Sequence, residues 1–338
     1  MVKEKRKHSF SQRKHKYQWQ AILWLLLPLG MLILFSYYPP IQALIDSFFD
    51  TQYDSTVGGY VDVFVGFRNY SELFNDHVFW VCIKNVLIFT GIGLVLGNFM
   101  TIFLAELLFN LKNKKLSSFF RVLFIIPILV PSIVILLIWK YAIFGNNGLM
   151  NEIIVSFGGE RQLWYWDSHN EFIGKFAIIF TNFPWVGGTA FLIYLAGLQN
   201  ISPSVMEASQ LDKCNVFKRI FKIDLPLIAS QLKYFLIMGV IGGFQNFDLQ
   251  LIVIGSEYDN TNVLGLYLYD RAFGQGYVKV DGGQVFQRFG YASAVGMIIL
   301  AVTLVLTIAN MQFNKERKPK NKKRKSITEE SLELRRGE

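Results

Sequence analysis

The chain has 338 residues, of which 52% are hydrophobic and only 17% are charged. A soluble protein carries about 25% charged residues, so this composition indicates a membrane protein and excludes a disordered, collagen-like or coiled-coil chain. The two cysteines and the four scattered histidines have no spacing that suits a metal ion. We also find no nucleophile beside a base at a plausible spacing, so we expect a chain that catalyses no reaction of its own.

Six long stretches with few or no charged residues mark the predicted membrane spans. A helix needs about 20 apolar residues to cross the roughly 30 Å hydrocarbon core of a bilayer. Five of the stretches are free of charge, and the sixth, at 225–254, is interrupted only by Lys233 and Asp248. We therefore predict an all-α, six-span domain over residues 21–312, between tails at 1–20 and 313–338. The predicted spans are 21–39, 85–105, 122–139, 176–206, 225–254 and 289–314.

Basic residues alternate between the segments that flank these spans. The segments before the first span, between spans two and three, between four and five, and after the sixth contain 7, 4, 4 and 10 Lys or Arg residues, together 25 of the 34 in the chain. Because basic residues concentrate in cytoplasmic segments, we predict that both termini are cytoplasmic. The stretch at 315–324 is strongly basic but has no interleaved aromatic residues, so we expect it to contact anionic lipid and not nucleic acid.

The segment at about 200–226, the loop between spans four and five, is predicted to form two short helices joined by a turn at the inner membrane surface. Ser202, which is followed by proline, suits the N-cap of the first helix, and Asn215 suits that of the second. Phe217 and Phe221 share one face of the second helix, and basic residues occupy the other. Such an amphipathic pair either rests on lipid headgroups or docks into a groove on a cytoplasmic partner.

This loop also resembles a known sequence motif. Glu207-Ala208-Ser209, then Asp212, and finally Leu225-Pro226 look like the EAA loop of the permeases of binding-protein-dependent ABC importers, in particular those for sugars. Further similar motifs follow one another in order between about residues 21 and 312. They are FVGFRNY at 64–70, GLMN at 148–151, LAGLQ at 195–199, FD at 247–248 and GYASA at 290–294.

In that family the EAA loop forms coupling helices, which insert into a cleft of a cytoplasmic ATPase and pass its closure to the membrane spans. The fold implied by the resemblance is that of an ABC importer type I permease. The resemblance implies a coupling role for this set of residues: Glu207, Ala208, Ser209, Asp212, Lys213, Phe217, Phe221, Leu225 and Pro226.

Two departures from the family pattern stand out. Lys213 occupies the position where the family usually has glycine, which suits a tight turn with positive φ. Either the turn is reshaped or Lys213 makes a contact of its own with the ATPase. Outside the membrane, the stretch at 255–258 lacks the usual Gly-Gly-Pro run and 275–288 looks like an extended insert, which bears on the docking of an extracellular binding protein.

Polar residues in spans four and five suggest a pathway for a sugar. A sugar needs hydrogen bonds from amides and carboxylates to its hydroxyl groups and an aromatic face against its ring, and polar groups in hydrocarbon must be paired or face a polar cavity. The alternative is that these groups bond between helices, with Gly187-Gly188 and Gly242-Gly243 allowing close packing. The predicted pathway residues are Asn182, Trp185, Thr189, Gln245, Asn246 and Asp248.

The energy for transport is expected on another polypeptide. The chain contains no G-x-x-x-x-G-K-[ST] phosphate loop, so ATP and Mg²⁺ would bind a partner ATPase and this chain needs no cofactor. An ion-coupled secondary transporter is the alternative class. Such proteins hold charged residues at mid-membrane. In this chain, five charged residues fall near span ends, where we interpret them as interfacial anchors: Lys84, Glu106, Lys140, Lys175 and Lys233.

The resemblance implies a bacterial plasma-membrane complex in which this chain pairs with a second permease, two ATPase domains and an extracellular binding protein. Transport would follow alternating access, and the substrate implied is a sugar or oligosaccharide, with a non-sugar solute such as glycerol phosphate as the alternative. The aromatic residues Trp164, Tyr165 and Trp166 are interpreted as part of an interfacial belt, with a platform for a carbohydrate as the alternative.

Overall fold

The computed structural model describes most of the chain. The predicted tails at 1–20 and 313–338 lie almost wholly outside the described residues, as do Trp166 and all of the predicted insert at 275–288 except its last residue. The described residues are 19–20, 22–54, 56, 59–165, 171–255, 261–273 and 288–313.

The regular structure of the described chain is helical apart from one β-hairpin, formed by β1 (Phe49–Asp54) and β2 (Gly59–Phe64). Three short π-helical turns and one 3₁₀ turn continue α-helices or link them. The helices are η1 Ile33–Tyr37, α2 Tyr38–Asp46, α3 Arg68–Asn75, α4 His77–Phe109, α5 Lys114–Ile125, η2 Ile126–Leu129, α6 Ser132–Leu137, η3 Ile138–Ile143, α7 Leu149–Ser156, α8 Glu171–Phe180, α9 Gly188–Gln199, α10 Pro203–Leu211, α11 Val216–Arg219, η4 Ile220–Asp224, α12 Leu225–Leu227, α13 Ala229–Gln245, α14 Asp248–Val253, α15 Leu264–Phe273 and α16 Phe289–Phe313.

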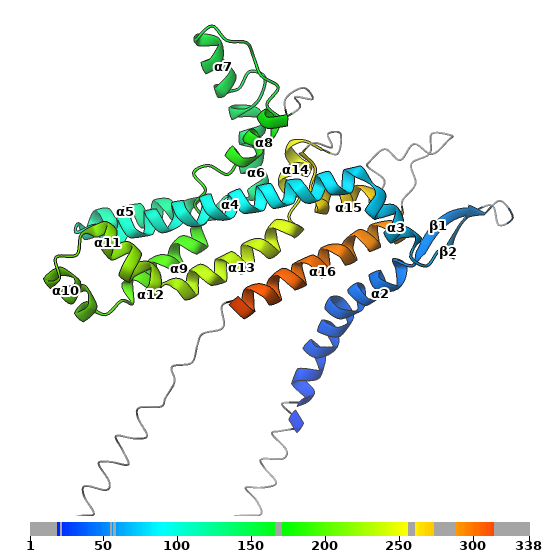
Figure 1. Ribbon diagram of the computed structural model, residues 1–338, viewed down its shortest axis with the longest axis horizontal. Coiled ribbons are helices and arrows are strands. Elements are labelled where there is room, and N and C mark those ends of the chain that lie inside the picture. The colour runs from blue at the N-terminus through cyan, green and yellow to red at the C-terminus, as the bar shows by residue number, and fades with distance from the viewer. Residues whose placement is uncertain are drawn as a thin grey trace, which may run out of the picture.

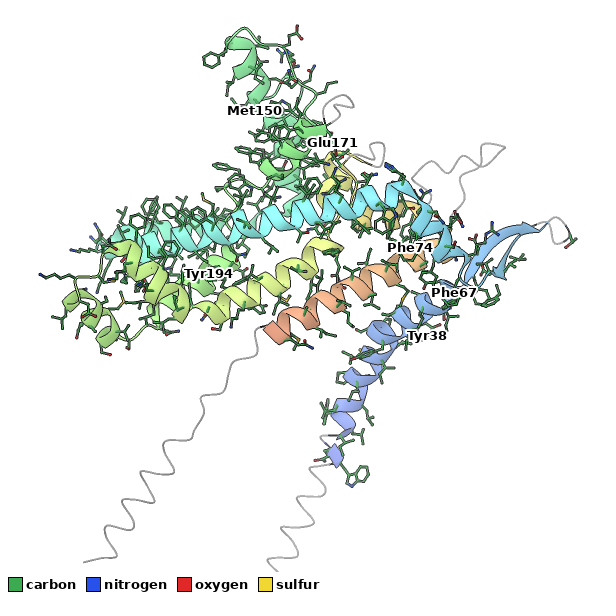
Figure 2. All side chains as sticks on the ribbon, in the orientation of Figure 1. Tyr38, Phe67, Phe74, Met150, Glu171 and Tyr194 are labelled. Atoms are coloured by element: carbon green, nitrogen blue, oxygen red, sulfur yellow. The ribbon has the colours of Figure 1, made fainter. Side chains whose placement is uncertain are left out.

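Three long helices, α4, α13 and α16, run side by side and form the centre of the molecule (Figure 1). Helix α9 packs against α4 and α13, and α15 packs against α4 and α16. The helix that begins at Ile22 touches α16 through α2 and otherwise leads away from this bundle. Figure 2 shows Tyr38 on that outlying helix, Tyr194 of α9 within the bundle, and Met150 and Glu171 on an arm that stands away from it.

Three described helices are long and apolar enough to cross a membrane, namely Ile22–Asp46, His77–Phe109 and Phe289–Ala309. Two further candidates are bent pairs. The pair Lys114–Leu129 and Ser132–Ile143 bends by 91°, and the pair Val216–Leu227 and Ala229–Gln245 bends by 70°. The described chain thus has three to five candidate spans, in agreement with the composition of a polytopic membrane protein.

The predicted fourth span, 176–206, is not one continuous helix. Helix α8 ends at Phe180 and α9 begins at Gly188, with a break between them. The break contains Pro184, which lacks a backbone N–H, and Trp185, whose φ is +58°. The uninterrupted run of apolar residues therefore concealed a change in backbone conformation.

Three apolar clusters hold the described helices together. One lies between α4, α15 and α16, another between α4, α9 and the start of α13, and the third between α6, α8 and α14. Trp164 and Tyr165 belong to the third cluster and are almost completely buried. The interpretation of these two residues as an interfacial belt was wrong, because their polar atoms bond inside the protein: the Tyr165 hydroxyl lies 2.9 Å from that of Thr181 and the Trp164 indole donates to Asn151.

The hairpin corrects the all-α prediction for residues 49–64. Its strands are antiparallel, with Phe49 opposite Phe64 and Tyr53 opposite Tyr60. Arg288, which precedes α16, fastens the hairpin to the bundle because its guanidinium donates to Asp50 at 2.9 Å and also binds Glu72 of α3.

Candidate functional site

A cavity of about 490 Å³ lies between α4, α9, α13 and α14, beside the break between α8 and α9. Most of its wall is apolar. Helices α4 and α13 contribute glycines to it, and the helix breaks contribute amides and an indole. The polar lining side chains are Thr90, Asn98, Thr101, Asn182, Trp185, Asn246 and Gln250.

The structure brings three of the six predicted pathway residues into this cavity. Asn182 and Trp185 come from the break between α8 and α9, and Asn246 comes from the break between α13 and α14. The other three, Thr189, Gln245 and Asp248, are exposed and are not among the lining residues.

Gln250 was missed by the sequence reasoning. It lines the cavity from α14 and is only 6% exposed. The signal was available, since Gln250 is a polar residue inside the apolar run 249–254. Asp248, two residues earlier, was predicted as a pathway residue instead, because it is charged.

The two helix breaks contribute Asn182, Trp185 and Asn246 to the polar part of the cavity wall. Irregular backbone at membrane depth is tolerated where it lines a cavity or is buried in protein. In the first break, the Trp185 indole donates to the carbonyl of Ile179 at 2.9 Å and so fixes its ring beside Phe183. In the second, the Asn246 side-chain oxygen accepts a hydrogen bond of 3.0 Å from the backbone N–H of Asp248, the first residue of α14.

Two glycines allow α13 to approach α4 closely along this wall. A Cβ on Gly239 would lie 2.3 Å from the Leu94 side chain, and one on Gly243 would lie 2.2 Å from the Thr90 hydroxyl. Gly242, by contrast, has nothing within 4 Å of such a Cβ. The predicted role of glycine in close helix packing is therefore confirmed at Gly243, and Gly242 faces open space.

The coupling loop, residues 200–226, folds into two short helices as predicted, α10 and α11, with η4 and α12 leading on to α13. Asn215 caps α11 through a hydrogen bond of 2.8 Å from the Lys218 N–H. Ser202 stands at the N-cap of α10, but its hydroxyl lies near that of Ser204 and makes no capping bond.

The turn between α10 and α11 keeps the geometry of a glycine turn without the glycine. Lys213 has φ +48°, its N–H donates to Gln210 O, and the Cys214 N–H donates to Ser209 O, both at 3.0 Å. These two bonds are the Schellman pattern that ends a helix on a left-handed residue. The turn is thus not reshaped, and Lys213 adopts a conformation that costs an L-residue about 1–2 kcal/mol.

The coupling loop exposes three large apolar side chains among its exposed charged residues. Leu211 is 84% exposed, Phe217 75% and Phe221 67%. Exposed large apolar side chains of this kind are typical of a surface that contacts lipid or a partner protein. Of the other predicted coupling residues, Glu207, Ala208, Asp212, Lys213 and Pro226 are exposed, Leu225 is half-buried, and Ser209 is buried with its hydroxyl donating to Met206 O.

Comparison with known proteins identifies the family. The family described as "Binding-protein-dependent transport system inner membrane component" matches residues 93–318 of this chain. The chain belongs to this family. The chain is therefore a membrane-embedded permease subunit of an ABC importer, and its role is transport and not catalysis.

Individual relatives agree with this assignment. The chain is 30% identical over 250 residues to the probable ABC transporter permease protein YesP of Bacillus subtilis (strain 168), covering 72% of this chain and 75% of YesP. It is 30% identical over 285 residues to the arabinooligosaccharides transport system permease protein AraP of the same organism, covering 83% and 84% of the two chains.

A solved structure shows the same fold. It is that of the bacterial alginate ABC transporter in complex with alginate pentasaccharide-bound periplasmic protein, which matches with a TM-score of 0.72 and 21% identity. The match covers 90% of this chain and 96% of that chain. The ABC importer type I permease fold that the motifs implied is thereby confirmed.

Proposed function

We propose that this permease imports a carbohydrate, most simply an oligosaccharide, by ATP-driven alternating access. The observation that carries the proposal is the pairing of one cavity, lined by Asn182, Asn246, Gln250 and the Trp185 indole, with an exposed apolar surface on the coupling loop. Amide groups exchange hydrogen bonds with sugar hydroxyls and an indole face packs on a sugar ring. The names of AraP and of the alginate transporter support the same class of substrate.

The cavity favours ATP-driven transport over ion coupling. Ion-coupled transporters place ionisable residues beside the substrate at membrane depth. Among the described residues that line this cavity there is no Asp, Glu, His, Lys or Arg. Asp248, the one acidic residue predicted for the pathway, is exposed and is not a lining residue.

The coupling loop is connected in sequence to the cavity wall. Helices α10 and α11 lead through η4 and α12 into α13, with a bend of 70° before Ala229. Helix α13 then lines the cavity at Phe235, Gly239 and Gly243. A push on the loop by a closing ATPase would therefore tilt a helix that forms the cavity wall, and this is how the chain would alternate access.

The proposed complex contains the partners implied by the family. They are a second permease subunit, cytoplasmic ATPases that bind ATP and Mg²⁺, and an extracellular substrate-binding protein, with no cofactor on this chain and no nucleic acid. We also propose that the domain at 21–312 crosses the plasma membrane six times, with the broken helix pair α8 and α9 as one crossing and both tails cytoplasmic. The distribution of basic residues supports this orientation.

Charge reversal at Glu207 tests the proposal. Glu207 is exposed on α10, so Glu207→Lys should leave the protein in the membrane while uptake falls to the background of a deletion strain. Uptake is measured with the sugar on which the intact strain grows and the deletion strain does not. The matched control is Ser118→Lys, which adds a positive charge at an exposed position of α5. Normal uptake by Glu207→Lys would contradict the coupling assignment.

A further inference from the structure

A buried cluster of charges joins the coupling loop to the cytoplasmic end of α4. The Arg219 Nε donates to Asp224 Oδ2 at 2.9 Å, within the loop. The same guanidinium also donates to Asn110 Oδ1 and lies 3.9 Å from Glu106 Oε2, both at the end of α4. Asn110 in turn donates to the Glu106 backbone carbonyl at 2.7 Å and to its carboxylate at 3.3 Å.

This cluster is built into the protein and does not lie on its surface. The side chain of Asp224 is fully buried, and those of Glu106 and Arg219 are 5% and 13% exposed. The interpretation of Glu106 as an interfacial anchor was therefore wrong. Taking such charges out of water is costly unless they are paired, and removing one member of a buried pair costs far more than removing a surface pair. The Arg219 guanidinium is thus held by Asp224 in the loop and by Asn110 and Glu106 at the end of α4.

The α4 end that Arg219 holds belongs to the helix that forms one wall of the cavity. Helix α4 lines the cavity from Val86 to Thr101. Glu106 lies five residues beyond Thr101, a distance of about 8 Å along a helix. Movement of the coupling loop therefore reaches the cavity by two routes, along α13 through the chain and along α4 through Arg219.

We infer that Arg219 is a positioning residue that ties the coupling loop to α4, so that ATP-driven movement of the loop moves both walls of the cavity together. The inference rests on the proposed function. Nothing in the coupling motif requires an arginine at this position, because the tie depends on Glu106 and Asn110, more than 100 residues away in the chain.

The test measures cavity access directly and needs no substrate. Thr90→Cys places a thiol in the cavity wall, in a chain with Cys214→Ser so that buried Cys82 is the one remaining native cysteine. The rate at which N-ethylmaleimide labels the introduced thiol is compared, in the complete complex purified from membranes, without nucleotide and with MgATP plus vanadate. In the chain that keeps Arg219, we expect MgATP plus vanadate to change the labelling rate at least about fivefold. The change should be less than about twofold in Arg219→Gln and intermediate in Arg219→Lys.

Two further variants separate positioning from simple damage. Asn110→Ala removes, at an exposed residue, the hydrogen bond from Arg219 to α4 and leaves the 3.9 Å approach to Glu106 in place. Arg219 and Asp224 stay paired in this variant, so it should reduce the MgATP response in the same direction as Arg219→Gln, even where the latter fails to assemble. Lys115→Gln removes an exposed charge from the same end of the molecule and should keep the full response. Co-purification of the ATPase and its basal activity are measured for every variant.

The outcomes are distinct. A full MgATP response in assembled Arg219→Gln, or in Asn110→Ala where Arg219→Gln does not assemble, would overturn the inference and leave the proposed function standing. A parent chain that labels at the same rate with and without MgATP, or that purifies with no ATPase, would overturn the proposed function and the inference with it. Loss of the response in both cut variants, with the ATPase still bound and the control normal, would establish Arg219 as the tie.

Discussion

Gly243 of α13 lies so close to Thr90 of α4 that a Cβ on the glycine would be 2.2 Å from the threonine hydroxyl and 2.5 Å from its methyl group. Threonine is branched at Cβ and has few alternative rotamers in a helix, so the side chain cannot turn away. The contact sits in the wall of the cavity. The spacing of the two helices, and with it the width of the cavity, depends on this glycine.

Gly243→Ala is expected to lower the free energy of unfolding by about 1–3 kcal/mol, because overpacking a close helix contact forces the backbones apart. Gly242→Ala is the matched control, since nothing lies within 4 Å of its Cβ and alanine favours the helix. Thermal unfolding in detergent measures both. The double variant Thr90→Ala with Gly243→Ala removes the 2.2 Å and 2.5 Å contacts but keeps the Thr90 Cβ, 2.8 Å from the new Cβ. It should therefore recover part of the loss, and an additive result would contradict the contact as its cause.

Asn246→Ala should lower the initial rate of uptake about tenfold, the effect of one lost hydrogen bond of about 1.4 kcal/mol to the substrate. The neighbouring variant Gln245→Ala should transport normally, because Gln245 is exposed and does not line the cavity, whereas Asn246 does. Both are compared at equal amounts of assembled complex. If the two variants transport equally, the cavity is not the pathway.

Lys213→Gly should stabilise the turn between α10 and α11, because glycine adopts a φ of +48° without the strain of a side chain. The expected gain in the free energy of unfolding is about 1 kcal/mol. Uptake measured in Lys213→Gly then shows whether the lysine side chain is needed for transport. Reduced uptake by this more stable variant indicates that Lys213 contacts the ATPase, and unchanged uptake indicates that it does not.

Asn151 should be essential for the folded structure of the arm at 145–165, which contains α7 and stands away from the bundle. Its amide donates to the carbonyls of Gly145, Asn146 and Gln162, and its oxygen accepts from the Gln162 N–H and the Trp164 indole. The residue itself is fully buried. Removing its amide leaves these groups without their partner, which costs about 1–3 kcal/mol for each group left unsatisfied.

Limited proteolysis measures this effect. Asn151→Ala should be cut within 145–165 many times faster than the unaltered protein, while Ser156→Ala, at an exposed position of the same helix, should be cut at the normal rate. Equal cutting rates for Asn151→Ala and the unaltered protein would show that other contacts hold the arm.

Glu72 gives a prediction for pH. The hydrogen bond from Arg288 holds the pKa of the Glu72 carboxyl below its usual 4.5, against the effect of partial burial. A depressed pKa means that the ionised carboxylate stabilises the folded state above pH 4.5, and that this stabilisation is lost as pH falls through the folded-state pKa. Glu72→Gln should therefore unfold at a lower temperature than the unaltered protein at about pH 7, and the difference should shrink as the pH falls below 4.5 through the folded-state pKa. A difference that stays constant with pH would mean that packing, and not charge, is responsible.

Local patterns in the sequence predicted the local structure well. The coupling loop has its two predicted helices and its Asn215 cap because caps depend on a few adjacent residues. The sequence left the conformation of Lys213 open, and the structure shows that it is left-handed. Asn182, Trp185 and Asn246 were expected near one another because polar residues at membrane depth must share a cavity or a partner, and the structure places all three in the wall of one cavity.

What the sequence could not show depends on contacts between distant segments. Glu106 looked like an anchor because it ends an apolar run, and only the fold brings Arg219 to it. The break at 181–187 was concealed because hydropathy reports burial in lipid and not backbone conformation. Thr189 and Gln245 are polar and close in sequence to cavity residues, yet helix geometry leaves them exposed outside it.

The most direct test of the whole account is gentle affinity purification of this chain from its native membrane, followed by mass spectrometry of the proteins that accompany it and by a transport assay in vesicles. The account predicts recovery of an ATPase with a phosphate-binding loop and of a second permease, and uptake that stops without ATP. A chain that purifies alone and still moves solute without ATP would contradict it, and the coupling loop would then be a surface helix pair.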